Sequence, residues 1–189
     1  ASFTGKLGVT GTSGPGLALK SETISLAVST ELPLIVVDVQ RGGPSTGLPT
    51  KPEQSDLMFA IYGRHGESPL PVLAIRSPSH AFETTIEAAR VALKYMTPVI
   101  LLSDNYVATG SEPWKLPAIG DLPTLETNLT TTINTEEGFM PFHRDVNTFA
   151  RPWAIPGTPG LEHRIGGLEK EEGTGDVSYD SANHQYMTD

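Results

Sequence analysis

Continuous apolar runs separated by segments of helical length constrain the fold of this 189-residue chain more than any other feature of its sequence. The runs that match buried strands cover residues 7–10, 32–39, 71–75 and 98–102. A strand that is apolar without interruption fits a sheet covered on both faces, as parallel sheets are. Because candidate helices lie between the runs, the sequence predicts an α/β fold with a parallel sheet flanked by helices.

Helical spacing of apolar residues supports three helices, at residues 17–31, 55–62 and 79–95. Ser55 and Ser79 are the expected N-caps of the second and third helices. The expected core-facing stripes of the first and third helices comprise Leu19, Thr23, Leu26, Ala27 and Thr30, and then Phe82, Ile86, Ala89 and Leu93. These helices would cover the predicted sheet.

Two loops rich in small residues follow predicted strands, at residues 11–16 and 40–54. In an open parallel sheet, ligands bind beyond the carboxyl ends of the strands. Both loops should therefore lie at one edge of the sheet, and we expect the functional site there.

The character of the sequence changes after residue 108. Pro, Gly, Thr and Glu dominate from there on, and no long periodic segment appears. A long irregular segment is unusual inside a compact domain. We therefore divide the chain into an α/β domain at residues 1–108 and an irregular linker or arm at 109–189, directed toward the next domain or a partner.

Charge and composition exclude several classes of function. The net charge of −9 argues against nucleic-acid binding, which requires cationic side chains. The absence of cysteine excludes disulfides, Cys-ligated zinc and a Cys-held iron–sulfur cluster within this chain, and no metal site is predicted. No apolar run approaches the roughly 20 residues of a membrane span, and a signal peptide is not expected. A cytoplasmic location is the default expectation.

The glycine-rich turn at residues 11–16 allows several interpretations. A dinucleotide-binding fold would use such a turn together with Asp38, but Leu19 occupies the place of the third glycine. A nucleophile elbow around Ser13 would need glycine at Pro15. A simple turn leading into a helix is the structural alternative.

The ordered set of motifs resembles the alpha subunit of 2-oxoacid:ferredoxin oxidoreductases, especially the 2-oxoglutarate type. The glycine-rich turn followed by residues 32–37 is similar to the pyrimidine-binding domain of thiamin diphosphate enzymes, including acetolactate synthase. The subfamily is indicated by the segments at residues 40–51, 53–57, 65–67, 98–104 and 162–167. The resemblance covers nearly the whole chain.

This resemblance implies oxidative decarboxylation of a 2-oxoacid on thiamin diphosphate, with electrons passed to ferredoxin and the acyl group to coenzyme A. The cofactor would lie between this chain, which would hold the aminopyrimidine, and a beta subunit carrying Mg²⁺ and the iron–sulfur cluster. The expected assembly is a hetero-oligomer. A non-oxidative thiamin-dependent decarboxylase or synthase and a non-catalytic assembly piece remain alternatives.

The resemblance also implies roles for individual residues. Arg41 would bind the substrate carboxylate, because a guanidinium presents a fork of donors; a surface arginine is the alternative. The other residues that we expect at the site are Ser45, Thr46 and Thr50 for the substrate, Thr12, Ser13, Gly14, Pro15 and Gly16 for the cofactor, and His65 for proton transfer. Solvated loop positions, and a structural role for His65, are the alternatives.

One expected residue is missing. Thiamin enzymes of this kind use a glutamate to protonate the pyrimidine, and none of Glu22, Glu31 and Glu53 occupies the matching place. The glutamate and the first strands would lie before residue 1. We therefore expect an incomplete domain that has no turnover alone.

Overall fold

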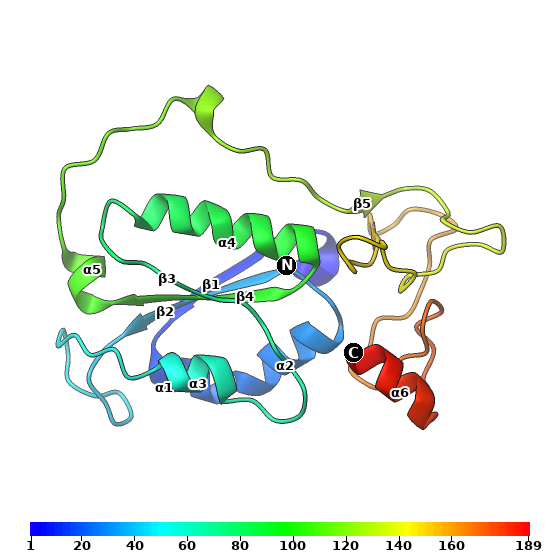
Figure 1. Ribbon diagram of the computed structural model, residues 1–189, viewed down its shortest axis with the longest axis horizontal. Helices are drawn as coiled ribbons and strands as arrows, with labels where there is room; N and C mark the ends of the chain where they lie inside the picture. Colours follow the sequence, from blue (N-terminus) through cyan, green and yellow to red (C-terminus); the bar gives the residue numbers. More distant parts are fainter.

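A four-stranded parallel sheet forms the centre of the computed structural model, which describes residues 1–189 (Figure 1). The strand order is β1-β2-β4-β3, so β2 and β4 are central. The strands are β1 (Gly8–Thr12), β2 (Leu34–Gln40), β3 (Val72–Ala74) and β4 (Pro98–Asp104). In the parallel register Thr12 lies beside Asp38, and Gln40 lies beside Asp104. The predicted α/β class is confirmed.

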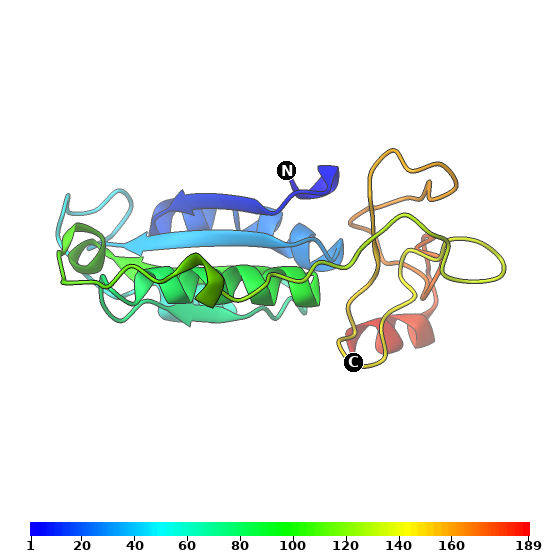
Figure 2. The same cartoon turned by 90° about the horizontal axis from the view of Figure 1, so that it is seen from above.

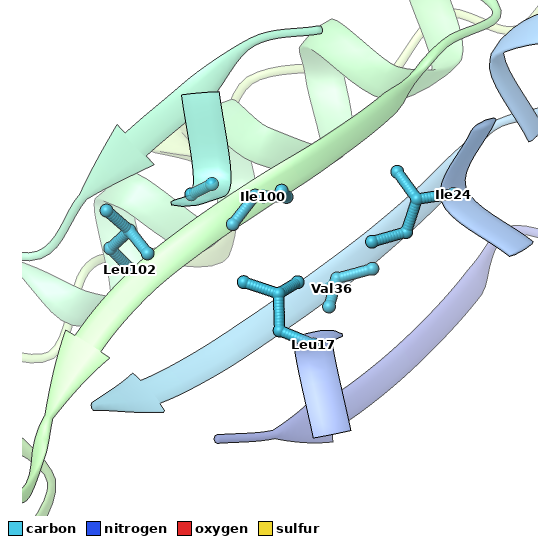
Figure 3. Packing of buried hydrophobic residues seen from close by; sticks show 6 residues of the cluster. Leu17, Ile24, Val36, Ile100 and Leu102 are labelled. Atoms are coloured by element: carbon cyan, nitrogen blue, oxygen red, sulfur yellow. The ribbon is translucent and has the colours of Figure 1, made fainter. Parts of the chain in front are cut away.

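Helices cover both faces of the sheet. On one face lie α1 (Gly14–Leu19), α2 (Ser21–Ser29) and α3 (Leu57–Tyr62), and on the other lies α4 (Ala81–Tyr95) (Figure 1). Alternate residues of β2 and β4 point to opposite faces, so each face has its own core. The core under α1–α3 comprises Leu17, Ile24, Val36, Ala60, Ile100 and Leu102 (Figure 3).

The core under α4 is built around alanines. Ala88, Ala89 and Ala92 face Ile35 and Leu101. Small side chains let the helix axis approach the sheet closely, which explains why this helix has few large core residues. Phe82 of the predicted stripe is 37% exposed, because it lies in the first turn and contacts Trp114 of the following segment instead.

Helix boundaries differ from the sequence-based expectation in three places. The first predicted helix starts earlier, at Gly14, because Pro15 fits the first helical turn, and it is interrupted at Lys20. The interruption turns Leu19 outward, to 83% exposure, so this stripe residue was wrongly predicted; Leu17 and Ile24 are buried instead. The residues before α3 and α4 are Asp56 and His80, not Ser55 and Ser79.

The segment after β4 is mostly irregular but contains short elements. These are α5 (Asn105–Thr109), the 3-10 helix η2 (Ile119–Asp121), β5 (Leu129–Thr130), β6 (Trp153–Ala154) and α6 (Ser181–Thr188); another 3-10 helix, η1 (Ser2–Thr4), opens the chain. Figure 2 shows that most of this arm lies beyond the amino ends of the strands. No helix combines the length and the apolar character needed to cross a membrane.

Candidate functional site at the carboxyl edge of the sheet

Three loops meet where β1, β2 and β4 end. β1 leads into α1 through the glycine-rich turn, β2 leads into the segment at residues 41–56, here called the arginine loop, and β4 leads into α5. Figure 1 shows the arginine loop and α5 together at this edge, at the end of the sheet opposite the arm. The predicted location of the two loops at one edge is therefore what the structure shows.

The glycine-rich turn brings backbone atoms unusually close to side chains. A methyl group on Gly16 would lie 1.8 Å from Oγ1 of Thr12, and one on Gly14 would lie 2.8 Å from both carboxyl oxygens of Asp56. Neither position tolerates a side chain without rearrangement. By contrast, a methyl group on Gly11 would meet no atom within 4 Å. The end of β1 therefore borders open space that no side chain of this chain fills.

The arginine loop is held in shape by its own hydrogen bonds. Backbone N–H groups of Gly42 and Leu48 donate to the carbonyls of Lys51 and Gly42, at 3.0 and 2.8 Å. Arg41 Nε donates to the carbonyl of Thr46 at 2.8 Å, and the terminal nitrogens of Arg41 make no hydrogen bond within the chain. Nε of Arg41 is thus fixed to the loop, whereas its two terminal nitrogens are free to bind an anionic ligand.

Two glutamines connect the loops to one another. Gln40 Nε2 donates to the carbonyl of Ser103 at 3.1 Å, while Gln40 Oε1 accepts from the backbone N–H of Asp56 at 3.0 Å. Gln54 Nε2 donates to Asp104 Oδ2 at 2.7 Å. The ends of β2 and β4 and both ends of the arginine loop are therefore tied together through side-chain amides.

Asp104 is the carboxylate of this network. Its other oxygen accepts from the backbone N–H of Val107 at 2.8 Å, which caps α5. Burial alone would raise the pKa of Asp104, but hydrogen bonds from Gln54, Val107 and Tyr106 hold it below its usual value. Asp104 is thus a structural anion at neutral pH.

Asp38 lies beneath the same edge, and its pKa is shifted in the opposite direction to that of Asp104. Its side chain is fully buried in β2, on the face covered by α1 and α3. Burial, with the neighbouring Asp56 carboxyl, raises the pKa of Asp38 from 3.8 to about 7. A carboxyl in this position is closed to a ribose hydroxyl, which argues against the dinucleotide-binding interpretation.

The structure brings together most, but not all, of the residues predicted for the site. Thr12, Ser13, Gly14, Pro15, Gly16 and Arg41 all lie at the carboxyl edge, and Ser45, Thr46 and Thr50 are exposed on the arginine loop. The side chain of His65 is instead 85% exposed, 4.0 Å from Glu22, in a broad hollow shared with Met96 and Thr97 before β4. The geometry gives no support to a catalytic role for His65.

Sequence reasoning missed the polar residues that hold the site in place. Gln40, Gln54, Asp56 and Asp104 were not predicted, and Asp38 was considered only as a nucleotide ligand. A signal was available, since Asp38 interrupts an apolar run and Asp104 lies two residues beyond the end of another. The partners across 16 to 50 residues of sequence could not be inferred without the fold.

Comparison with known proteins gives consistent matches. The family model described as pyruvate flavodoxin/ferredoxin oxidoreductase, thiamine diP-bdg, matches residues 1–180. The 2-oxoglutarate oxidoreductase subunit KorA of Mycobacterium tuberculosis is 60% identical over 99% of this chain, which covers 28% of that protein. The 2-oxoglutarate synthase subunit KorA of Archaeoglobus fulgidus is 44% identical over 67% of this chain and 36% of that protein.

A solved structure matches nearly the whole chain. It is the 2-oxoglutarate:ferredoxin oxidoreductase from Magnetococcus marinus with 2-oxoglutarate, coenzyme A and succinyl-CoA bound. The TM-score is 0.86 with 42% sequence identity, over 98% of this chain and 32% of that one. The chain therefore spans about a third or less of the length of these relatives.

Proposed function

The chain belongs to the thiamine diphosphate-binding family of pyruvate flavodoxin/ferredoxin oxidoreductases, and from this premise we propose that it is part of a 2-oxoglutarate:ferredoxin oxidoreductase. The observation that carries the proposal is the 60% identity, over 99% of this chain, with a relative named 2-oxoglutarate oxidoreductase subunit. The matching solved enzyme holds 2-oxoglutarate and coenzyme A, which supports the same substrate and acyl acceptor. The enzyme would decarboxylate the 2-oxoacid oxidatively and pass electrons to ferredoxin.

Thiamin diphosphate fits the carboxyl edge as this chain builds it. When bound, the cofactor supplies the carbanion chemistry that decarboxylation of a 2-oxoacid needs. Open space beside Gly11, at the start of the half-buried glycine-rich turn, leaves room for a flat ring. Thr12, Ser13 and Gly14 would line that ring, and the Pro15–Gly16 start of α1 would hold the turn rigid.

Arg41 is the residue that we assign to the substrate carboxylate. The hydrogen bond from its Nε to the carbonyl of Thr46 orients the guanidinium and leaves both terminal nitrogens for an anion. Ser45, Thr46 and Thr50 lie on the same loop and would shape the pocket around the substrate. These assignments rest on position and on free donors.

The proposal includes partners, because this chain would supply only one side of the cofactor site. A beta subunit would close the site and carry Mg²⁺ and an iron–sulfur cluster, so that the working enzyme is a hetero-oligomer. Ferredoxin would accept the electrons, and coenzyme A the acyl group. A cytoplasmic location remains a prediction from sequence.

The direct test measures 2-oxoglutarate-dependent reduction of ferredoxin or a viologen dye by the full-length protein with its partner subunits, thiamin diphosphate and coenzyme A. For Arg41→Ala we expect KM for 2-oxoglutarate to rise roughly 10- to 100-fold, with a smaller change in kcat, because a hydrogen bond to a charged group contributes about 1.5–3 kcal/mol. Arg90→Ala is the matched control, since Arg90 pairs with Glu87 on α4.

Each outcome has a distinct meaning. Thiamin-dependent activity that needs Arg41 supports the proposal. Thiamin-dependent release of CO₂ without dye reduction would indicate the non-oxidative alternative. No thiamin-dependent turnover of any 2-oxoacid would refute the proposed function.

A further inference from the structure

Asp38 and Asp56 form a buried carboxyl pair beneath the candidate site. Asp38 has no exposed surface, and neither of its carboxyl oxygens receives a hydrogen bond from any donor group of the chain. Oδ2 of Asp56 is likewise buried without a donor. Asp56 is held beside Asp38, because its backbone N–H donates to Gln40, two residues further along β2, and its carboxyl lies next to Gly14, just past the β1 residue that pairs with Asp38. Two buried carboxylates cannot satisfy each other when both are ionised, because each is then an acceptor.

No cation neutralises this pair. Of the elements packed around it, β1 and α1 contain no ionisable residue, and α3 contains only Tyr62, which is exposed. Asp104 on β4 is bonded to Gln54 and Val107. On the arginine loop, Nε of Arg41 is bonded to the carbonyl of Thr46, and Glu53 lies against Gly42. A proton on one of the two carboxyl groups, donated in a hydrogen bond to the other, is therefore the remaining way to stabilise the pair.

The position of Asp56 gives the pair its importance. Asp56 closes the arginine loop and precedes α3, and its backbone N–H is held by Gln40. Its carboxyl oxygens also occupy the place that a side chain on Gly14 would take, 2.8 Å from the position of a Cβ there. The Asp56 side chain thus lies at the junction of β2, the loop that carries Arg41 and the turn assigned to the cofactor.

We propose that Asp38 and Asp56 share a single proton, and that this acid–carboxylate hydrogen bond positions the arginine loop against the glycine-rich turn. Both are positioning residues, since neither is placed to touch substrate. Loss of the shared proton would set two buried negative charges against each other and would move Asp56, and with it the loop, away from the sheet. The expected change in KM rests on the proposed function, whereas the shared proton and its effect on the loop do not.

The pH range of the effect follows from the environment of Asp38. Its pKa is raised from 3.8 to about 7 by burial and by Asp56. Between these values the folded protein binds a proton that the unfolded chain has released, so this contribution to stability declines as the pH rises through that range. We expect the loop to be held at pH 6 and to loosen above a pH of about 7.

Hydrogen exchange of the arginine-loop amides tests the proposal without any substrate. In the full-length protein with its partner subunits, we expect protection of these amides to fall above a pH of about 7, after correction for the intrinsic rate. Asp38→Asn should keep them protected at all pH values, because an amide donates permanently to Asp56. Asp56→Asn should behave in the same way, with the direction of donation reversed. Asp121→Asn, the same change at an exposed position on η2, should retain the wild-type profile.

Kinetics supply the second measurement. Wild-type KM for 2-oxoglutarate should rise above a pH of about 7, whereas KM of Asp38→Asn should remain flat; Asp38→Ala should raise KM roughly tenfold at every pH. If Asp38→Ala fails to fold, the two asparagine variants still decide the question. Identical exchange profiles for wild type and Asp38→Asn would overturn the proposal. Absence of 2-oxoglutarate turnover together with the expected exchange profiles would overturn the proposed function and leave the shared proton standing.

Discussion

At the residue scale, Gly47 determines the shape of the arginine loop. Its φ is +63°, and a methyl group there would lie 1.7 Å from the carbonyl oxygen of Gly42. That carbonyl already accepts the hydrogen bond from Leu48. The added methyl would clash with a backbone atom, so the clash could be relieved only if the loop backbone moved.

We therefore expect Gly47→Ala to weaken 2-oxoglutarate binding, seen as a raised KM and faster hydrogen exchange in the arginine loop. Gly66→Ala is a matched control, because Gly66 has φ +66° but no atom within 4 Å of the added methyl. In the control, the free energy of unfolding should fall only by the roughly 1–2 kcal/mol that a left-handed backbone conformation costs a residue other than glycine. Equal effects of the two changes would show that conformational strain alone, and not the Gly42 contact, is responsible.

Residue roles were predictable from the sequence where a motif marked them. Arg41 and the glycine-rich turn stand out in the sequence and do lie at one edge of the sheet. Asp38 and Asp56 did not stand out as a pair, because their contact depends on how α3 packs on β2. His65 fits proton transfer only by its imidazole, and chemical type alone does not give a position.

At the element scale, the central strands carry the stability of the domain. β4 is buried along its whole length and pairs with both β2 and β3. The sequence predicted this strand well, since continuous apolar runs reflect burial on both faces. Helix starts were predicted less well. Serine is favoured at N-caps in general, but Asp56 precedes α3 in the structure because Gln40 binds its backbone N–H.

Ile100→Ala tests the contribution of β4. Ile100 is fully buried between Val36 and the helices α1–α3 (Figure 3). Removing its side chain should lower the free energy of unfolding by about 2–5 kcal/mol, measured by denaturant titration. Ile119→Ala, at a position 89% exposed on η2, should change it by less than about 0.5 kcal/mol. A small effect at Ile100 would mean that the surrounding core refills the cavity.

At the scale of the whole molecule, the two ends of the sheet contact different parts of the chain. The carboxyl edge holds the candidate site, and the amino end holds the arm (Figure 2). The sequence predicted an arm from its composition but not where it would pack, because its few contacts are made by single residues far apart along the chain. One of these contacts is a buried group of Arg151, Lys170 and Phe142 beside the end of α2.

Glu31, two residues after the end of α2, binds two arginines of the arm. Its carbonyl accepts from Arg151 Nε at 3.1 Å, and its carboxylate pairs with Arg144. Burial lowers the pKa of Arg151 to about 10, although Glu31 opposes the shift, so the guanidinium stays charged at neutral pH. A buried charge is tolerated only while its hydrogen-bond partners stay in place.

Arg151→Met should therefore detach the arm while leaving the sheet folded. Methionine fills much of the same volume but donates nothing to Glu31 and Pro152, so both carbonyls lose their partner. Limited proteolysis should cut within residues 129–170 faster than in wild type, and Arg164→Met, at an exposed position, should not. Because the arm packs at the end of the sheet away from Arg41, KM for 2-oxoglutarate should change little in Arg151→Met. A large increase in KM without faster proteolysis would instead mean that the two ends of the sheet are coupled through β2 and β4.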